Sequence, residues 1–102
     1  MKKKIYTIKE IQEKVIPVLE KSPVVKAILF GSYSQGNATP HSDIDILIDS
    51  NGVLRGLDFY GVLESLVEAT EKDIDLIEKQ ELVAGALIER EIYASGIVIY
   101  ER

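Results

Sequence analysis

The fold of this chain is decided by one continuous stretch, Phe30-Gly31-Ser32-Tyr33-Ser34-Gln35-Gly36-Asn37-Ala38-Thr39-Pro40-His41-Ser42-Asp43-Ile44-Asp45-Ile46-Leu47-Ile48. An apolar, β-branched run over 24–30 predicts a strand that ends at a glycine. The polar residues 31–42 predict a loop with room for one helical turn. Alternating acidic and apolar residues over 43–49 then predict a second strand. The stretch therefore joins two strands through a polar connection.

The first half of the connection suits a bound anion. Gly31 directly follows the first predicted strand, and its missing side chain lets backbone N–H groups approach an anion closely. Ser32 adds a hydroxyl donor beside them. Gly31 and Ser32 are therefore the candidate triphosphate-binding residues.

The second strand carries two carboxylates that suit a hard cation. Asp43 and Asp45 are two positions apart, so both side chains project from one strand face while Ile44, Ile46 and Ile48 face the core. Two like charges held side by side repel unless a cation with phosphate oxygens neutralises them. The pair therefore predicts Mg²⁺.

A third carboxylate would complete a site for two ions roughly 3.5–4 Å apart. The predicted strand 73–77 supplies either Asp73 or Asp75, because alternation places both on one face. Asp75 lies deeper among apolar residues and is the preferred candidate. Asp43, Asp45 and Asp75 are thus the predicted metal ligands and catalytic residues.

The remaining residues predict an α/β or α+β domain. Thr7 and Glu10 form a capping-box pattern at the start of a helix over 8–21, which Pro17 should kink or split. Further helices are expected over 57–70 and 81–94, and a last strand over 97–100. In the helix over 81–94, the residues expected to face inward are Ala84, Leu87, Ile88 and Ile92. Residues 1–102 should form a single domain in which helices cover a small mixed sheet.

Composition excludes several classes of protein. The chain has no cysteine and one histidine, so a thiolate or imidazole-rich metal site is excluded. Its formal charge of −5 argues against direct binding of nucleic acid through backbone phosphates. No apolar stretch reaches the ~20 residues of a membrane span, and the lysines at 2–4 lead into polar sequence instead of a signal peptide. We therefore expect a cytoplasmic protein that does not bind membranes.

Gly31-Ser32, ten intervening residues, Asp43-x-Asp45 and a later Asp75-Leu76 together resemble the nucleotidyltransferase superfamily shared by DNA polymerase beta and the kanamycin nucleotidyltransferases. The short chain is similar to the minimal nucleotidyltransferase (MNT) proteins, usually the antitoxin partners of HEPN-domain toxins. The resemblance implies the nucleotidyltransferase fold. It also implies Gly31, Ser32 and Ser42 as nucleotide-binding residues and two Mg²⁺ ions on Asp43, Asp45 and Asp75. Where the family often has Ala-Arg-Gly, this chain has Ser34-Gln35-Gly36 and lacks the arginine.

The same resemblance implies transfer of AMP from ATP to a tyrosine hydroxyl of a HEPN toxin. Two other functions stay open: an antitoxin that neutralises its partner by binding alone, and nucleotidyl transfer to a small molecule such as an aminoglycoside. Surplus apolar area on the last helix would suit a partner or a homodimer.

Simpler interpretations exist for each feature. Asp43 and Asp45 could keep a strand edge soluble, and Asp75 could belong to a solvated strand face. Gly31 and Ser32 could mark an ordinary turn, and His41 could be an exposed loop residue.

Overall fold

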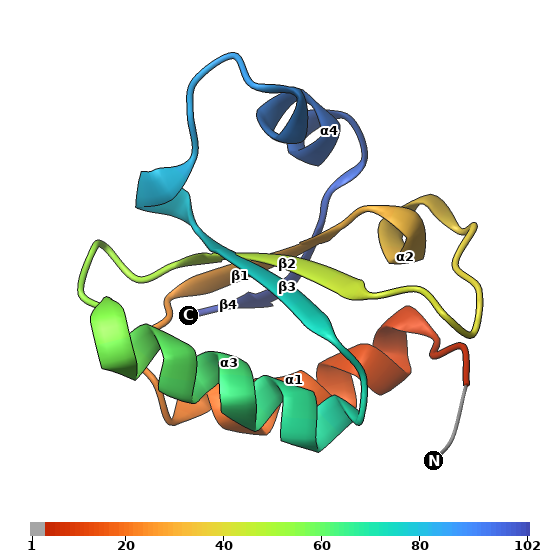
Figure 1. Ribbon diagram of the computed structural model, residues 1–102, viewed down its shortest axis with the longest axis horizontal. Helices are drawn as coiled ribbons and strands as arrows, with labels where there is room; N and C mark the ends of the chain where they lie inside the picture. The colour runs from red at the N-terminus through yellow and green to blue at the C-terminus, as the bar shows by residue number, and fades with distance from the viewer. Residues whose placement is uncertain (1–3) are drawn as a thin grey trace.

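The computed structural model describes residues 4–102 (Figure 1). Met1–Lys3, which include two of the lysines at 2–4, lie outside the described residues. The elements in chain order are α1 (Ile8–Glu20), β1 (Lys26–Phe30), α2 (Ser32–Gln35), β2 (Ile44–Asp49), α3 (Gly56–Thr70), β3 (Ile74–Glu78), the 3₁₀ helix η1 (Lys79–Glu81), α4 (Leu87–Ser95) and β4 (Ile97–Glu101). Within this part of the chain, no helix has both the length and the apolar character to cross a membrane.

The four strands form a mixed sheet in the order β3-β2-β1-β4. β1 is antiparallel to both β2 and β4, whereas β2 and β3 are parallel. Figure 1 shows α1 and α3 together on one face of the sheet and α4 on the other, with α2 following the end of β1. The predicted small mixed sheet covered by helices is therefore confirmed.

The main core lies between the sheet and the α1/α3 layer. Ile44, Ile46 and Ile48 of β2 are fully buried in it, as their alternation with polar residues predicted. Leu66 of α3 is also fully buried, and α1 contributes three buried residues at helical spacing: Ile11, Val15 and Leu19.

Helix α1 begins as the sequence predicted. The Thr7 hydroxyl accepts from the Glu10 N–H, and the Glu10 carboxylate accepts from the Thr7 N–H, which completes the capping box. The expected split at Pro17 is wrong, because α1 continues to Glu20. Pro17 is exposed, so the carbonyl left without its amide partner lies on the side of the helix that faces water.

The prediction for the last helix is wrong in its start and in its buried face. α4 begins at Leu87 instead of residue 81, because Gly85 adopts a positive φ of 83° that interrupts any helix. Ala84 and Ile88 are exposed and Leu87 is 80% exposed, while Ile92 is buried. Of the four residues, only Ile92 is buried, and it packs against Phe30 and Leu47 of the sheet.

Candidate functional site

The candidate site lies where the end of β1 meets the starts of β2 and β3. In the antiparallel pair, Phe30 of β1 lies opposite Asp45 of β2. In the parallel pair, Asp45 lies opposite Asp75 of β3. The structure therefore brings the Gly31 turn and both acidic strands to one edge of the sheet, although these segments are far apart in the sequence.

The carboxylates project away from the main core. Ile44 and Ile46 of β2 are fully buried against the α1/α3 layer, so Asp45 between them faces the opposite side of the sheet. Asp45 is partly buried, whereas Asp43 and Asp75 are exposed. The register also separates the two candidates for the third acid, because Asp75 pairs with Asp45 while Asp73 precedes β3.

The surroundings of Asp45 disfavour its charge. Burial, followed by the negative charges of Asp75, Asp43 and Glu91, raises its pKa from 3.8 to about 6. Such a carboxylate gains from a bound cation, which would remove the repulsion that its neighbours impose.

The position of the Asp45 side chain requires a glycine at residue 31, which the sequence did not indicate. A Cβ atom on residue 31 would overlap the Asp45 Oδ2 atom. The residue also has a φ of 74°, which glycine adopts without strain. The missing side chain therefore makes room for the carboxylate, in addition to exposing the backbone of the turn.

The predicted turn after Gly31 is the four-residue helix α2, which begins at Ser32. Its first amide groups have no partner within the helix because they lie at its start. No side chain caps them either, so they are available at the end of β1. The Ser34 hydroxyl is already engaged, because it donates to the Gly31 carbonyl at 3.0 Å. Ser32 is partly exposed beside these amides, and its role in binding an anion stays a prediction.

Ser42 stabilises the loop that leads into β2. Its Oγ accepts from the Thr39 N–H at 2.8 Å, and its own N–H donates to the Thr39 carbonyl at 3.0 Å. The hydroxyl groups of Thr39 and Ser42 also lie 3.4 Å apart, within hydrogen-bonding distance of each other. His41 is exposed in the same turn, as the simpler interpretation expected.

Glu91 of α4 was not foreseen as part of this site. Its carboxylate contributes to the raised pKa of Asp45 and accepts from Gln35 Nε2 at 3.4 Å. Gln35 occupies the position where the family often has arginine, so α2 and α4 meet through this pair. Nothing in the sequence indicated that Glu91 belongs to the site. The buried face predicted for its helix was wrong, so the side of the helix that faces Asp45 was not foreseen.

The donor set fits magnesium only in part. Within residues 4–102, no three carboxylate or imidazole side chains already stand close enough to hold a metal ion. The available ligands are hard carboxylate oxygens, and Mg²⁺ is usually bound through one or two carboxylates together with substrate phosphates. The site therefore fits a cation that arrives with a triphosphate better than one held by the protein alone.

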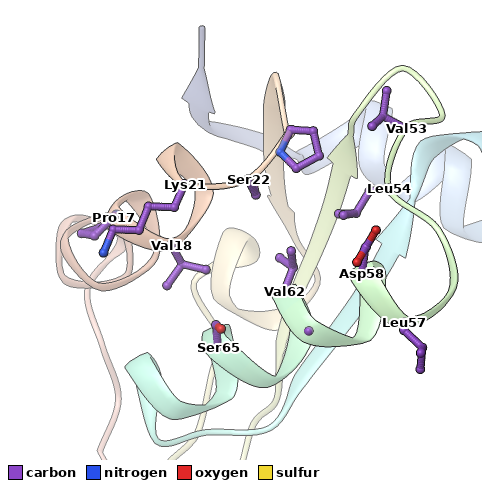
Figure 2. A pocket seen from close by; sticks show the side chains of 12 residues that line it. Pro17, Val18, Lys21, Ser22, Val53, Leu54, Leu57, Asp58, Val62 and Ser65 are labelled. Atoms are coloured by element: carbon purple, nitrogen blue, oxygen red, sulfur yellow. The ribbon is translucent and has the colours of Figure 1, made fainter.

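A separate hollow lies at the opposite end of the sheet. It has a volume of about 520 Å³ and lies between the end of α1 and the start of α3. Figure 2 shows Val18 and Lys21 on the α1 side and Leu54, Asp58 and Val62 on the α3 side among the residues that line it. None of the acidic candidate residues lines this hollow. We therefore place the candidate site at the carboxylates and not in this cavity.

Comparison with known families identifies the family of this chain. The family described as "Polymerase beta, Nucleotidyltransferase" matches residues 13–102. The chain belongs to this family. The nucleotidyltransferase fold expected from the Gly-Ser and Asp-x-Asp pattern is thereby confirmed, and the chain is classed as an enzyme of the nucleotidyltransferase type.

Relatives of this nucleotidyltransferase include named protein adenylyltransferases. It is 37% identical over 70 residues to MJ0435 of Methanocaldococcus jannaschii, which carries such a name, covering 69% of this chain and 75% of the relative. It is 35% identical over 69 residues to the protein adenylyltransferase MntA of Shewanella oneidensis. That match covers 66% of this chain and half of MntA.

A solved structure of a toxin-antitoxin complex with AMP-PNP has the same fold. A chain of that complex superimposes with a TM-score of 0.77 at 25% identity, covering 89% of this nucleotidyltransferase and 73% of the other chain.

Proposed function

We propose that this nucleotidyltransferase is an antitoxin that transfers AMP from Mg-ATP to a tyrosine hydroxyl of a partner HEPN toxin. The proposal rests on the Asp45–Asp75 pairing beside the Gly31 turn, which supplies anionic metal ligands next to free backbone amides. The names of the relatives support protein adenylylation, and the toxin-antitoxin complex with AMP-PNP supports an adenine nucleotide as donor.

Each residue of the site has a proposed role. Gly31, Ser32 and Ser42 would hold the triphosphate, and Asp43, Asp45 and Asp75 would hold two Mg²⁺ ions. When bound, these ions would neutralise phosphate charge and lower the pKa of the acceptor hydroxyl. The acceptor oxygen forms a bond to the α-phosphorus while the bond to pyrophosphate breaks, and Asp75 accepts the hydroxyl proton.

The intact mass of the candidate partner tests this proposal. The protein encoded beside this chain would be incubated with it, Mg²⁺ and each nucleoside triphosphate in turn. We expect the partner to gain one or more AMP units with ATP, and fragmentation to place them on tyrosine. Asp43→Asn with Asp45→Asn should abolish the gain, whereas the charge-matched control Asp58→Asn with Glu64→Gln, on the exposed side of α3, should retain it.

A stable complex without any mass gain would contradict the enzymatic function and favour neutralisation by binding alone. One observation favours this second candidate: Gln35, bonded to Glu91, offers no cation to the phosphates. Protection of cells by the double aspartate variant would support the same conclusion.

A further inference from the structure

A nearly buried lysine links the loop before the acidic strand to the start of β3. Lys72 is 9% exposed, and its Nζ donates to the Pro40 carbonyl at 3.0 Å. The two residues are 32 positions apart in the sequence. Burying an ammonium group is costly unless it is paired or hydrogen-bonded, so this placement calls for an explanation.

The ammonium group of Lys72 is stabilised without a carboxylate. Among the ion pairs of the described residues, none includes Lys72. Its Nζ instead lies 5.8 Å from the centre of the Tyr6 ring, and the Tyr6 hydroxyl donates to the Thr70 carbonyl at 2.8 Å. Tyr6 therefore supports both the side chain of Lys72 and the backbone just before it.

The loop that Lys72 holds carries two residues of the proposed site. Thr39 and Ser42 close a tight turn through two hydrogen bonds, and the Pro40 carbonyl within that turn accepts from Lys72. Asp43 follows immediately. On the other side of the link, Asp75 lies three positions after Lys72.

We propose that Lys72 is a positioning residue: its bond to the Pro40 carbonyl holds the 39–43 loop against the start of β3 and so sets Ser42 and Asp43 relative to Asp75. The Ile44 N–H donates to the Asp73 carbonyl at 3.0 Å and joins the same two segments one step further along. Lys72 touches neither nucleotide nor metal in this role. Its effect on catalysis rests on the proposed function.

Lys14 offers a matched control for Lys72. Its Nζ lies 5.3 Å from the same Tyr6 ring, but the residue has no bond to the 39–43 loop. Lys14→Met and Lys72→Met each remove one ammonium group from this ring, and only Lys72→Met releases the loop. If the two lysines acted only through their cation–π contacts with Tyr6, the two variants would have the same kcat and the same exchange rate at Ser42.

The first test compares the two variants in the transfer reaction and in unfolding. We expect Lys72→Met to lower kcat about ten- to a hundred-fold, the range that a small misplacement of reacting groups produces. Its midpoint of thermal unfolding should change little, because the lost hydrogen bond to Pro40 is offset by removing a costly buried ammonium group. Lys14→Met should keep the wild-type kcat.

The second test restores the ammonium group. The chain has no cysteine, so Lys72→Cys can be alkylated at one position with 2-bromoethylamine in urea and then refolded. The product carries an ammonium group on a side chain of nearly lysine length, and should recover kcat. Alkylation that adds an uncharged propyl group should not.

Exchange of the Ser42 amide hydrogen reports on the loop without any need for activity. We expect it to be about ten-fold faster or more in Lys72→Met and unchanged in Lys14→Met. If the wild-type chain transfers no nucleotide, the proposed function fails, and the exchange rate still decides the role of Lys72. Wild-type exchange in Lys72→Met, wild-type kcat in that variant, or recovery with the propyl group would each overturn the inference.

Discussion

Gly31 lies against the carboxylate of Asp45, so that a Cβ atom on residue 31 would overlap Oδ2 and stand 3.0 Å from Cγ. We expect Gly31→Ala to displace Asp45 and to reduce nucleotidyl transfer by about 100-fold or more, since such misplacement is costly. The free energy of unfolding should fall by about 1–3 kcal/mol, because alanine is also strained at this φ. Transfer rates and urea unfolding measure the two effects.

Gly56→Ala is the control for backbone strain alone. Gly56 also has a positive φ, of 58°, but a Cβ atom there meets no atom within 4 Å. This variant should lose stability and keep its activity. Equal losses of activity in the two glycine variants would show that the contact with Asp45 is unimportant.

The raised pKa of Asp45 predicts a pH-dependent stability in the absence of metal. The unfolded chain keeps a pKa near 3.8, whereas the folded value is about 6, so the folded state binds this proton more tightly. The stabilisation is therefore complete below pH 3.8 and is lost as the pH rises through 6. Because Asp45 is only partly buried, solvent screening should limit it to about 1 kcal/mol.

Thermal unfolding in EDTA at pH 5 and pH 8 measures this effect. Asp45→Asn should reduce the difference between the two midpoints, while Glu64→Gln, an exposed change on α3, should not. At pH 8, Mg²⁺ with ATP should raise the midpoint of the wild type and leave Asp45→Asn unchanged. An identical pH response in Asp45→Asn would contradict the assigned cause.

Glu91 adds negative charge to the site from α4. Glu91→Gln should keep an oxygen that accepts from Gln35 while it removes that charge. We expect the pKa of Asp45 to fall and the Mg²⁺ concentration for half-maximal transfer to rise about two- to five-fold, an effect of up to roughly 1 kcal/mol. Glu64→Gln, an exposed change on α3, is the control and should keep the wild-type Mg²⁺ dependence. If Glu91→Gln shows the same Mg²⁺ dependence as this control, Glu91 does not act on the metal.

Ser50 and Glu78 form a buried polar pair at the other end of β2 and β3. The Ser50 backbone N–H and hydroxyl both donate to Glu78 Oε2, and Ser50 Oγ accepts from the Leu54 N–H at 3.0 Å. Ser50→Ala leaves a buried amide without its acceptor, which should cost about 1–3 kcal/mol of stability. The exposed Ser65→Ala is the control in chemical denaturation, and nearly equal midpoints would refute the prediction.

The acidic strands were predictable because their pattern is local. Alternation alone places Ile44, Ile46 and Ile48 in the core and Asp45 on the opposite face, and the structure agrees. The capping box at Thr7 and Glu10 was predictable for the same reason, since both residues lie within one helical turn. Asp75 was preferred over Asp73 from its apolar neighbours, and the register pairs it with Asp45; its catalytic role stays a prediction.

The last helix shows where local patterns were insufficient. The apolar residues from Ala84 to Ile92 fit a helical face, yet Gly85 interrupts the helix and Leu87 is exposed. α4 has a single buried residue, Ile92, and helical spacing could not indicate which of its apolar residues would pack on the sheet. Glu91 went unnoticed for this reason.

The sequence by itself determined the family, the strand-loop-strand arrangement and the acidic side chains, because periodicity, turn residues and motif spacing act over a few neighbouring positions. Only the tertiary structure decided which distant groups meet: Gly31 with Asp45, Glu91 with Gln35, and Lys72 with the Pro40 carbonyl. Those contacts depend on strand register and on the packing of helices across the sheet. Both arise from the whole folded chain, so no local segment encodes them.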